Sequence, residues 1–304
     1  MPHTAFHLIK PHVKELGDGF TVRRSLPSHP HKMVGPFIFF DHMGPAHLEP
    51  GGLGLQVRPH PHIGLATVTY LFEGAIMHRD SLGYQQEIRP GDVNWMTAGS
   101  GIVHSERTPE HLRAEGGTMH GIQIWIALPK SDEFTEPHFE HHPGATLPEI
   151  RGEGVHLRLI AGAGFGLTSP VTTFSPLFYA ALDLAPGARF TLPAEHPERA
   201  VYAVEGEVLV DGEVLPETAM AVLSAGQDTT IEAPAQTGTG ARLMLLGGEP
   251  LDGDRYISWN FVASSREAIE EARQRWRERA FGKVPGETEW IPLPDERKAP
   301  ESFS

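Results

Sequence analysis

One glycine pattern occurs twice in this chain of 304 residues, and it constrains the fold more than any other feature of the sequence. Each half carries a first glycine, a second glycine about twenty residues later that directly follows a strand-like segment, and a turn of small residues. In the first half these landmarks are Gly54, Gly74 and the turn Thr97-Ala98-Gly99; in the second half they are Gly187, Gly206 and the turn Ser224-Ala225-Gly226. Self-similarity on this scale predicts two copies of one β-unit.

Short apolar segments bounded by turn residues predict strands in both halves. The clearest is 121–129, where Ile122, Ile124 and Ile126 recur at every second position, as in a strand with one face in a core. Further strands are expected at 20–26, 36–41, 67–74, 93–96, 155–161, 177–184 and 200–210. The segment 44–54 is rich in Gly and Pro and is expected to be a loop. With 33 Gly and 27 Pro in the chain, the composition favours many turns and an all-β fold.

A polar segment at 130–150, rich in proline and histidine, predicts a boundary between the two units. We therefore expect an N-terminal metal-binding domain at 1–135, a C-terminal domain without metal ligands at 136–262, and a helix with a tail at 263–304.

The predicted helix begins with a capping-box pattern, Ser264 with Glu267 three residues later. Its apolar positions recur at helical spacing and are Ile269, Ala272, Trp276 and Ala280. We expect Trp276 to pack inward and Gly282 to end the helix. The tail from Pro285 onward is expected to be extended or loosely held.

Two short motifs in the first half form a candidate metal site. His60 and His62 are two residues apart, as are His104 and Glu106. Residues at this spacing project to one face of a strand, so each pair can present both side chains to one point. Three neutral imidazoles and one carboxylate suit a divalent transition metal such as Fe, Mn, Ni, Cu or Zn, and are too rich in nitrogen for Ca or Mg. Four ligands on an octahedral ion leave two positions open, as catalysis or ligand binding requires.

The second copy lacks this ligand set. At the corresponding positions it has Pro193, Glu195, Ile231 and Ala233. One mononuclear metal site per chain, in the first unit, is therefore expected.

The chain has 18 histidines, so other histidine pairs are expected by chance. The tripeptide His29-Pro30-His31 lacks the glycine frame and the His-x-Glu partner, and we expect a surface loop there. The residues His138, His141 and His142 fall in the predicted linker and are expected to be solvated. His120 could line the site, but a core or interface position is favoured.

Charge and cysteine content exclude several function classes. The formal net charge of −14 repels phosphate backbones, so direct nucleic-acid binding is disfavoured. The absence of cysteine excludes disulfides and thiolate ligands. The sequence shows neither a signal peptide nor an apolar run long enough for a membrane helix, and a cytoplasmic location is expected.

The first half resembles the cupin superfamily. The segment from Gly54 through His62 to Gly74 is similar to its first motif, and the segment from Gly91 to His104 is similar to its second. Thr67 stands where a first-motif glutamate is usual, and Glu106 follows the second-motif histidine by two. This pattern resembles pirin, a bicupin family. Further segments carry the resemblance: Arg23-Arg24-Ser25, Phe40-Asp41, Trp95-Met96-Thr97-Ala98-Gly99, Gly121-Ile122-Gln123-Ile124-Trp125 and Gly247-Gly248-Glu249-Pro250-Leu251.

The resemblance implies a bicupin of two stacked cupin β-sandwich barrels with a C-terminal α-helix. It also implies a single metal in the N-terminal barrel, held by His60, His62, His104 and Glu106. Iron as Fe(II) is the metal it favours, with Mn, Ni, Cu, Co or Zn as alternatives.

The resemblance leaves two functions open. One is a quercetin 2,3-dioxygenase, which would use dioxygen to cleave a flavonol-like aromatic substrate, with Glu106 as the catalytic base. The other is an iron-binding, redox-responsive regulatory protein that acts through protein partners. An open aromatic pocket would favour the enzyme, and a closed one the regulator. A cupin sugar isomerase ranks last, because the residues near the site are apolar.

Overall fold

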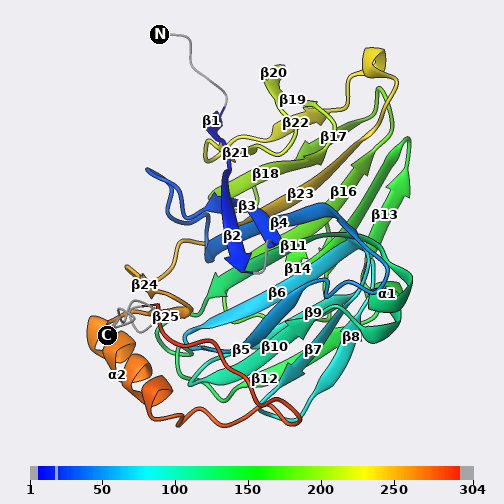
Figure 1. The fold of residues 1–304 in the computed structure, drawn as a ribbon. Helices are drawn as coiled ribbons and strands as arrows, with labels where there is room; N and C mark the ends of the chain where they lie inside the picture. The colour runs from blue at the N-terminus through cyan, green and yellow to red at the C-terminus, as the bar shows by residue number, and fades with distance from the viewer. Residues whose placement is uncertain (1–5, 18–19, 295–304) are drawn as a thin grey trace, which may run out of the picture.

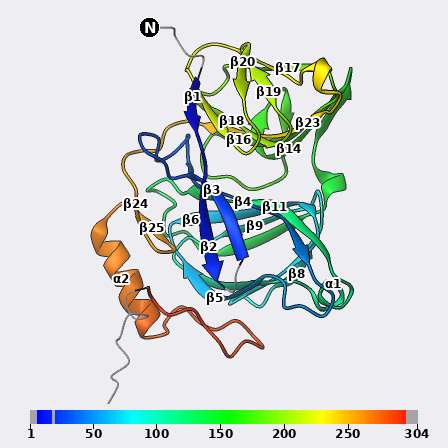
Figure 2. The same ribbon diagram turned by 45° about the horizontal axis from the view of Figure 1, so that its top comes forward.

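The computed structural model describes residues 6–17 and 20–294, and its main elements are strands arranged in two stacked units (Figures 1 and 2). Each unit combines one large antiparallel sheet with one four-stranded sheet. The predicted all-β fold with a C-terminal helix and the predicted duplication are both confirmed.

The large sheet of the first unit has the strand order β12-β9-β6-β11-β4-β3-β2. Its strands are β12 (His138–His142), β9 (Val93–Thr97), β6 (Leu65–Glu73), β11 (Gly117–Ala127), β4 (Phe37–Leu48), β3 (Phe20–Leu26) and β2 (His12–Gly17). The small sheet has the order β5-β10-β7-β8, with β5 (Gln56–His62), β10 (Ile102–Arg107), β7 (Ile76–Asp80) and β8 (Gln85–Ile88). A short helix, α1 (Glu110–Glu115), connects β10 to β11.

The second unit repeats this plan. Its large sheet has the order β1-β21-β18-β23-β16-β14-β13, and β15 pairs with β14. These strands are β1 (Phe6–Ile9), β21 (Met220–Leu223), β18 (Glu198–Glu205), β23 (Ala241–Gly248), β16 (Leu177–Leu184), β14 (Val155–Gly164), β13 (Glu149–Gly152) and β15 (Leu167–Thr168). The small sheet consists of β17 (Arg189–Leu192), β22 (Thr229–Glu232), β19 (Val208–Val210) and β20 (Glu213–Leu215), in that order.

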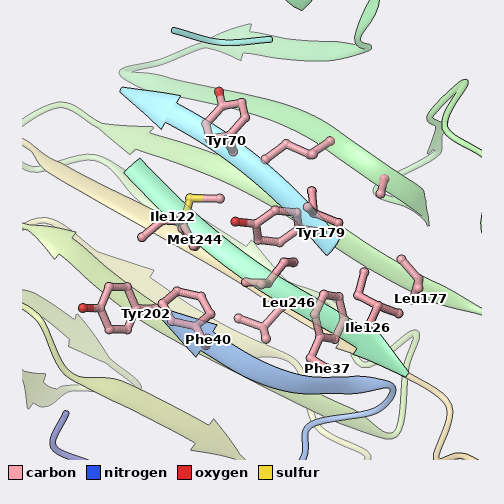
Figure 3. Packing of buried hydrophobic residues seen from close by; sticks show 14 of the residues in the cluster. Phe37, Phe40, Tyr70, Ile122, Ile126, Leu177, Tyr179, Tyr202, Met244 and Leu246 are labelled. Carbon is pink, nitrogen blue, oxygen red and sulfur yellow. The ribbon is translucent and has the colours of Figure 1, made fainter. Parts of the chain in front are cut away.

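The largest core cluster lies between the two large sheets. Phe37, Phe40, Tyr70, Ile122 and Ile126 from the first unit pack with Leu177, Tyr179, Tyr202, Met244 and Leu246 from the second (Figure 3). The alternating segment predicted at 121–129 forms most of β11, and its isoleucines enter this core as expected. Because successive side chains point to opposite faces of a strand, Gln123 and Trp125 face the interior of the first unit instead. β11 thus joins the inter-unit core to the candidate site.

Two strands cross the boundary expected at residue 135. β1 pairs with β21 of the second unit, and β12 pairs with β9 of the first. The solvated linker predicted for His138, His141 and His142 is therefore wrong, because these residues form β12. The division into 1–135, 136–262 and 263–304 stays a prediction about folding domains.

The loop predicted at 44–54 is wrong for its first residues, since β4 continues to Leu48. Residues Ala46, His47 and Leu48 pair with Met119, Thr118 and Gly117 of β11. A partner strand about seventy residues away supplies these hydrogen bonds, and the local Gly-Pro content does not reveal it.

The C-terminal helix, α2 (Arg266–Arg277), is present, but Ser265 caps it rather than Ser264. The Ser265 hydroxyl accepts a hydrogen bond from the Ala268 amide at 3.2 Å. Ser264 is engaged elsewhere, because its hydroxyl donates to Glu133 at 2.8 Å. The helix ends at Arg277, so Ala280 and Gly282 lie beyond it.

Trp276 packs inward as predicted, in a cluster that includes Ile63 and Val103, the residues next to the ligand candidates His62 and His104. A two-stranded hairpin, β24 (Tyr256–Ser258) with β25 (Phe261–Ala263), follows the second unit in the sequence and precedes α2. It contacts the first unit through a β-bridge between Phe261 and Ile63. Within the described residues, no helix has the length and apolar character needed to cross a membrane.

The expectation of a loosely held tail is wrong for residues 285–294. The Ile291 amide donates to the Pro59 carbonyl at 2.8 Å, and Leu293 is fully buried. Glu287 accepts hydrogen bonds from Ser105 at 2.9 Å and from Arg107 at 2.6 Å. We call residues 285–294 the C-terminal strap. It packs along β5 and β10, the strands that carry the candidate ligands.

Candidate metal centre

Strand pairing brings the three predicted histidines together. In the antiparallel pair β5 and β10, His104 lies opposite His60 and Ile102 lies opposite His62. One ring nitrogen of each histidine falls within 4.8 Å of the others, and the Nε2 atoms of His62 and His104 are 3.1 Å apart. All three side chains are buried. Across the part of the chain that the structure describes, this is the one such group of three metal-ligating side chains.

Hydrogen bonds from Nδ1 orient two of the rings. His60 Nδ1 lies 2.8 Å from the Arg58 carbonyl oxygen, and His62 Nδ1 lies 3.0 Å from the Asn260 carbonyl oxygen. A carbonyl only accepts, so each Nδ1 carries a hydrogen and each Nε2 keeps a free lone pair. Metal-ligating histidines are commonly fixed in this way.

Burial keeps these imidazoles neutral. It lowers the pKa of His60 and holds the pKa values of His62 and His104 well below the ordinary value, and neighbouring histidines lower the last two further. Binding to a metal requires a neutral imidazole, so the protonation state needs no adjustment near pH 7. The donor set fits a divalent transition metal.

Glu106 lies beside the histidines but outside the group of three. A β-bulge separates His104 from Glu106 on β10. The carboxylate accepts hydrogen bonds from the Gln123 amide at 3.0 Å to each oxygen, and from the Thr69 hydroxyl at 3.4 Å. Glu106 lines the same pocket as His60 and His62. Its assignment as the fourth ligand and as the base stays a prediction.

His60 and His62 line a pocket of about 390 Å³ with an aromatic wall. Phe39 and Trp125 stack with ring centroids 4.0 Å apart, and Trp125 contacts His62 edge-on at 5.1 Å. Lys14 and Glu15 lie among the lining residues and are exposed, so the pocket reaches the protein surface.

A row of polar side chains also crosses this pocket. Thr69, Gln123 and Asp41 lie opposite one another on β6, β11 and β4, and Arg24 follows on β3. Arg24 makes two hydrogen bonds of 2.8 Å to the buried Asp41 and stacks over Phe39 at 4.1 Å. Burial raises the pKa of Asp41, while Arg24 acts in the opposite direction. The sequence analysis named Arg24, Asp41 and Gln123 only as parts of segments that resemble pirin. It did not predict that they lie in the site.

The hairpin tip between β24 and β25 completes the pocket. Trp259 and Asn260 both line it, as does Ile291 of the C-terminal strap. Trp259 has a φ of 56°, which is unusual for a bulky residue and is a type of strain found at functional sites. No local motif marks these residues, because they come from almost two hundred residues further along the chain.

The remaining histidine predictions have clear outcomes. His120 is an interface residue, as favoured: its Nε2 lies 2.8 Å from His42 Nε2, and His42 Nδ1 lies 2.9 Å from the Tyr202 hydroxyl of the second unit. The segment His29-Pro30-His31 forms no strand, and its first two residues are exposed, as expected.

In the second unit, Glu195 is the one metal-ligating side chain at the positions matching the ligands, and in the described segments of the chain it belongs to no group of three such side chains. Ile231 and Ala233 are buried in the apolar core there. The guanidinium of the buried Arg199 donates instead to the carbonyls of Leu192, Pro193, Ser224 and Gln227.

Comparison with known proteins agrees with this fold. Residues 19–126 match the pirin family model, and residues 179–282 match the pirin C-terminal cupin domain. A pirin-like protein of Caulobacter vibrioides is 52% identical over 286 residues, which cover 93% of this chain and 96% of the relative. A Pseudomonas aeruginosa protein, provisionally named a quercetin 2,3-dioxygenase, is 42% identical over 87% of this chain and 81% of its own length.

Among solved structures, a quercetin 2,3-dioxygenase from Acinetobacter baumannii superposes with a TM-score of 0.87. It is 36% identical, and the match covers 98% of this chain and 97% of that one. With both halves matched and a relative identical at half of its positions, the chain belongs to the pirin family of bicupins.

Proposed function

We propose that this protein is a metal-dependent dioxygenase that cleaves quercetin-like flavonols, with Fe(II) as the favoured metal. The observation that carries the proposal is a group of three neutral histidines, two of which, His60 and His62, line a surface-accessible pocket with an aromatic wall. The provisional name of the Pseudomonas relative and the likeness to the Acinetobacter quercetin 2,3-dioxygenase support the same reaction class.

The residues of the chain have distinct roles in this proposal. His60, His62 and His104 hold the metal through Nε2, and Glu106 is the candidate fourth ligand. When bound, the divalent ion supplies Lewis acidity and the redox chemistry needed for reaction with dioxygen. Phe39 and Trp125 offer a flat apolar wall on which a planar flavonol ring can lie.

Glu106 is the proposed base, because a carboxylate within hydrogen-bond reach can take the proton of the flavonol 3-hydroxyl. Gln123 donates to both of its oxygens and so aims the carboxylate into the pocket. In the overall reaction, two carbon–carbon bonds of the central ring break. One ring carbon leaves as carbon monoxide, and both atoms of dioxygen are retained in the depside product.

The decisive experiment is anaerobic purification, removal of metal, and reconstitution with Fe(II), Mn(II), Ni(II), Cu(II), Co(II) or Zn(II) in turn. Quercetin loss and carbon monoxide release are then followed after dioxygen is admitted. We expect carbon monoxide in equal amount to the quercetin lost with at least one metal. No carbon monoxide with any metal would refute the dioxygenase and favour the iron-dependent regulator, whose pocket was expected to be closed.

A further inference from the structure

His104 is oriented differently from the other two candidate ligands. Its Nδ1 faces no carbonyl and instead lies 3.4 Å from Nδ1 of His78. The other nitrogen of His78, Nε2, lies 2.8 Å from Oδ2 of Asp80. Both residues are on β7, beside β10 in the small sheet, and the Asp80 side chain is fully buried.

The direction of each hydrogen bond in the series from His104 through His78 to Asp80 follows from the carboxylate at its end. A carboxylate only accepts, so Nε2 of His78 carries a hydrogen, and in the neutral ring Nδ1 of His78 is then the acceptor. That acceptor requires the hydrogen of His104 to be on Nδ1. The Nε2 of His104, which lies near His62, then keeps the lone pair that a metal needs.

The surrounding structure holds both Asp80 and His78 in place. Oδ1 of Asp80 accepts hydrogen bonds from the Leu82 amide at 2.9 Å and the Tyr84 amide at 3.1 Å. The His78 ring stacks on Phe139 of β12, with centroids 4.3 Å apart and an interplanar angle of 14°. Neither Asp80 nor His78 lines the substrate pocket, so their effect has to pass through His104.

We propose that Asp80, acting through His78, is a positioning residue that holds His104 in the tautomer able to bind a divalent metal. The inference rests on the proposed function in one respect, namely that the three histidines bind metal. It assigns a role to two residues that touch neither the metal nor the substrate.

The first test is Asp80→Asn, which preserves shape and the acceptor for the loop amides. Its amide group would donate to Nε2 of His78, which reverses both hydrogen bonds and moves the His104 hydrogen to Nε2. Loss of the correct tautomer through such a substitution has a precedent in the catalytic triad. We expect nitrogen-15 NMR of the metal-free protein to show this tautomer change, and Co(II) affinity to fall 10- to 100-fold.

A second variant separates tautomer control from packing. In His78→Phe, the ring can still stack on Phe139 but has no nitrogen, so residue 80 can no longer act on His104 through residue 78. Asp80→Asn should therefore change Co(II) affinity less than threefold in a chain that also carries His78→Phe. The matched control is Glu140→Gln on β12, because Glu140 is also paired with a histidine, His142 at 2.9 Å, but contacts none of the three candidate ligands.

The outcomes separate the two proposals. An unchanged His104 tautomer in Asp80→Asn, or an equal loss of affinity with and without His78→Phe, overturns the positioning role. A wild-type protein that binds none of the metals would refute the proposed function instead, because the tautomers are read in the metal-free protein.

Discussion

At the residue scale, the site depends on which nitrogen or oxygen atoms remain free. The i, i+2 spacing predicted that the three histidines would lie together, because both members of such a pair share a strand face, and the structure groups them; their binding of a metal stays a prediction. His78 and Asp80 have the same spacing on β7, so the same reasoning applied to His-x-Asp could have found them. Asn260 could not be found in this way, since it contributes a backbone carbonyl that any residue could supply.

Substitution Glu106→Gln tests the proposed base. The amide can still bond to Gln123 but cannot accept a proton, so we expect the rate of carbon monoxide release to fall by about 10²- to 10⁴-fold. Metal content, measured by mass spectrometry, should fall much less. His62→Ala should remove the metal itself, and Glu195→Gln in the second unit serves as the control. Full activity in Glu106→Gln would show that another group takes the proton.

At the element scale, local pattern predicted strands well and predicted their neighbours poorly. β11 alternates strictly, so its two faces could be assigned from sequence. The positions of β12 and the C-terminal strap could not be predicted from the local sequence, because both are held by partners far away in the chain. In the sequence, the segment with the β12 histidines resembles a polar linker, and the strap resembles a free tail. In the structure, Ile291 bonds to Pro59 of β5 and Leu293 is buried.

The buried leucine of the strap provides an element-scale prediction. Leu293→Ala should lower the free energy of unfolding by about 2–5 kcal/mol, because the substitution leaves a cavity in a packed core. Leu53→Ala is the matched control: Leu53 is 63% exposed, and the same change there should cost less than about 0.5 kcal/mol. Urea unfolding followed by tryptophan fluorescence measures both. Equal costs would mean that the strap does not contribute to the folded core in solution.

At the scale of the whole molecule, the two units share one plan but stabilise their ligand ends differently. In the first unit, the pairing of β5 with β10 groups three histidines at the site, whereas in the second the Arg199 guanidinium bridges the corresponding loops through four carbonyls. The sequence did not reveal this bridge in the second unit, because Arg199 lies outside the motif positions.

The contact between the units predicts a pH dependence of stability. Burial, with contributions from His120 and Arg23, lowers the pKa of His42 to about 3 in the folded protein. The unfolded chain has the ordinary value of 6.5, so between these two values the unfolded state binds more protons than the folded state. Stability is therefore full above pH 6.5 and declines as the pH falls, at up to about 1.4 kcal/mol per pH unit for this group.

His42→Gln removes this titration and keeps a polar side chain beside Tyr202 and His120. Urea unfolding at pH 7 and pH 5 should show a loss of stability on acidification that is smaller in the variant than in the wild type, by about 2 kcal/mol. His111→Gln is the control, because the side chain of His111 is 54% exposed and lies away from the contact between the units. If the wild type and His42→Gln lost equal stability, the pKa of His42 in the folded protein would have to be near its ordinary value of 6.5. Burial between the two large sheets would then not exclude the charged form of His42.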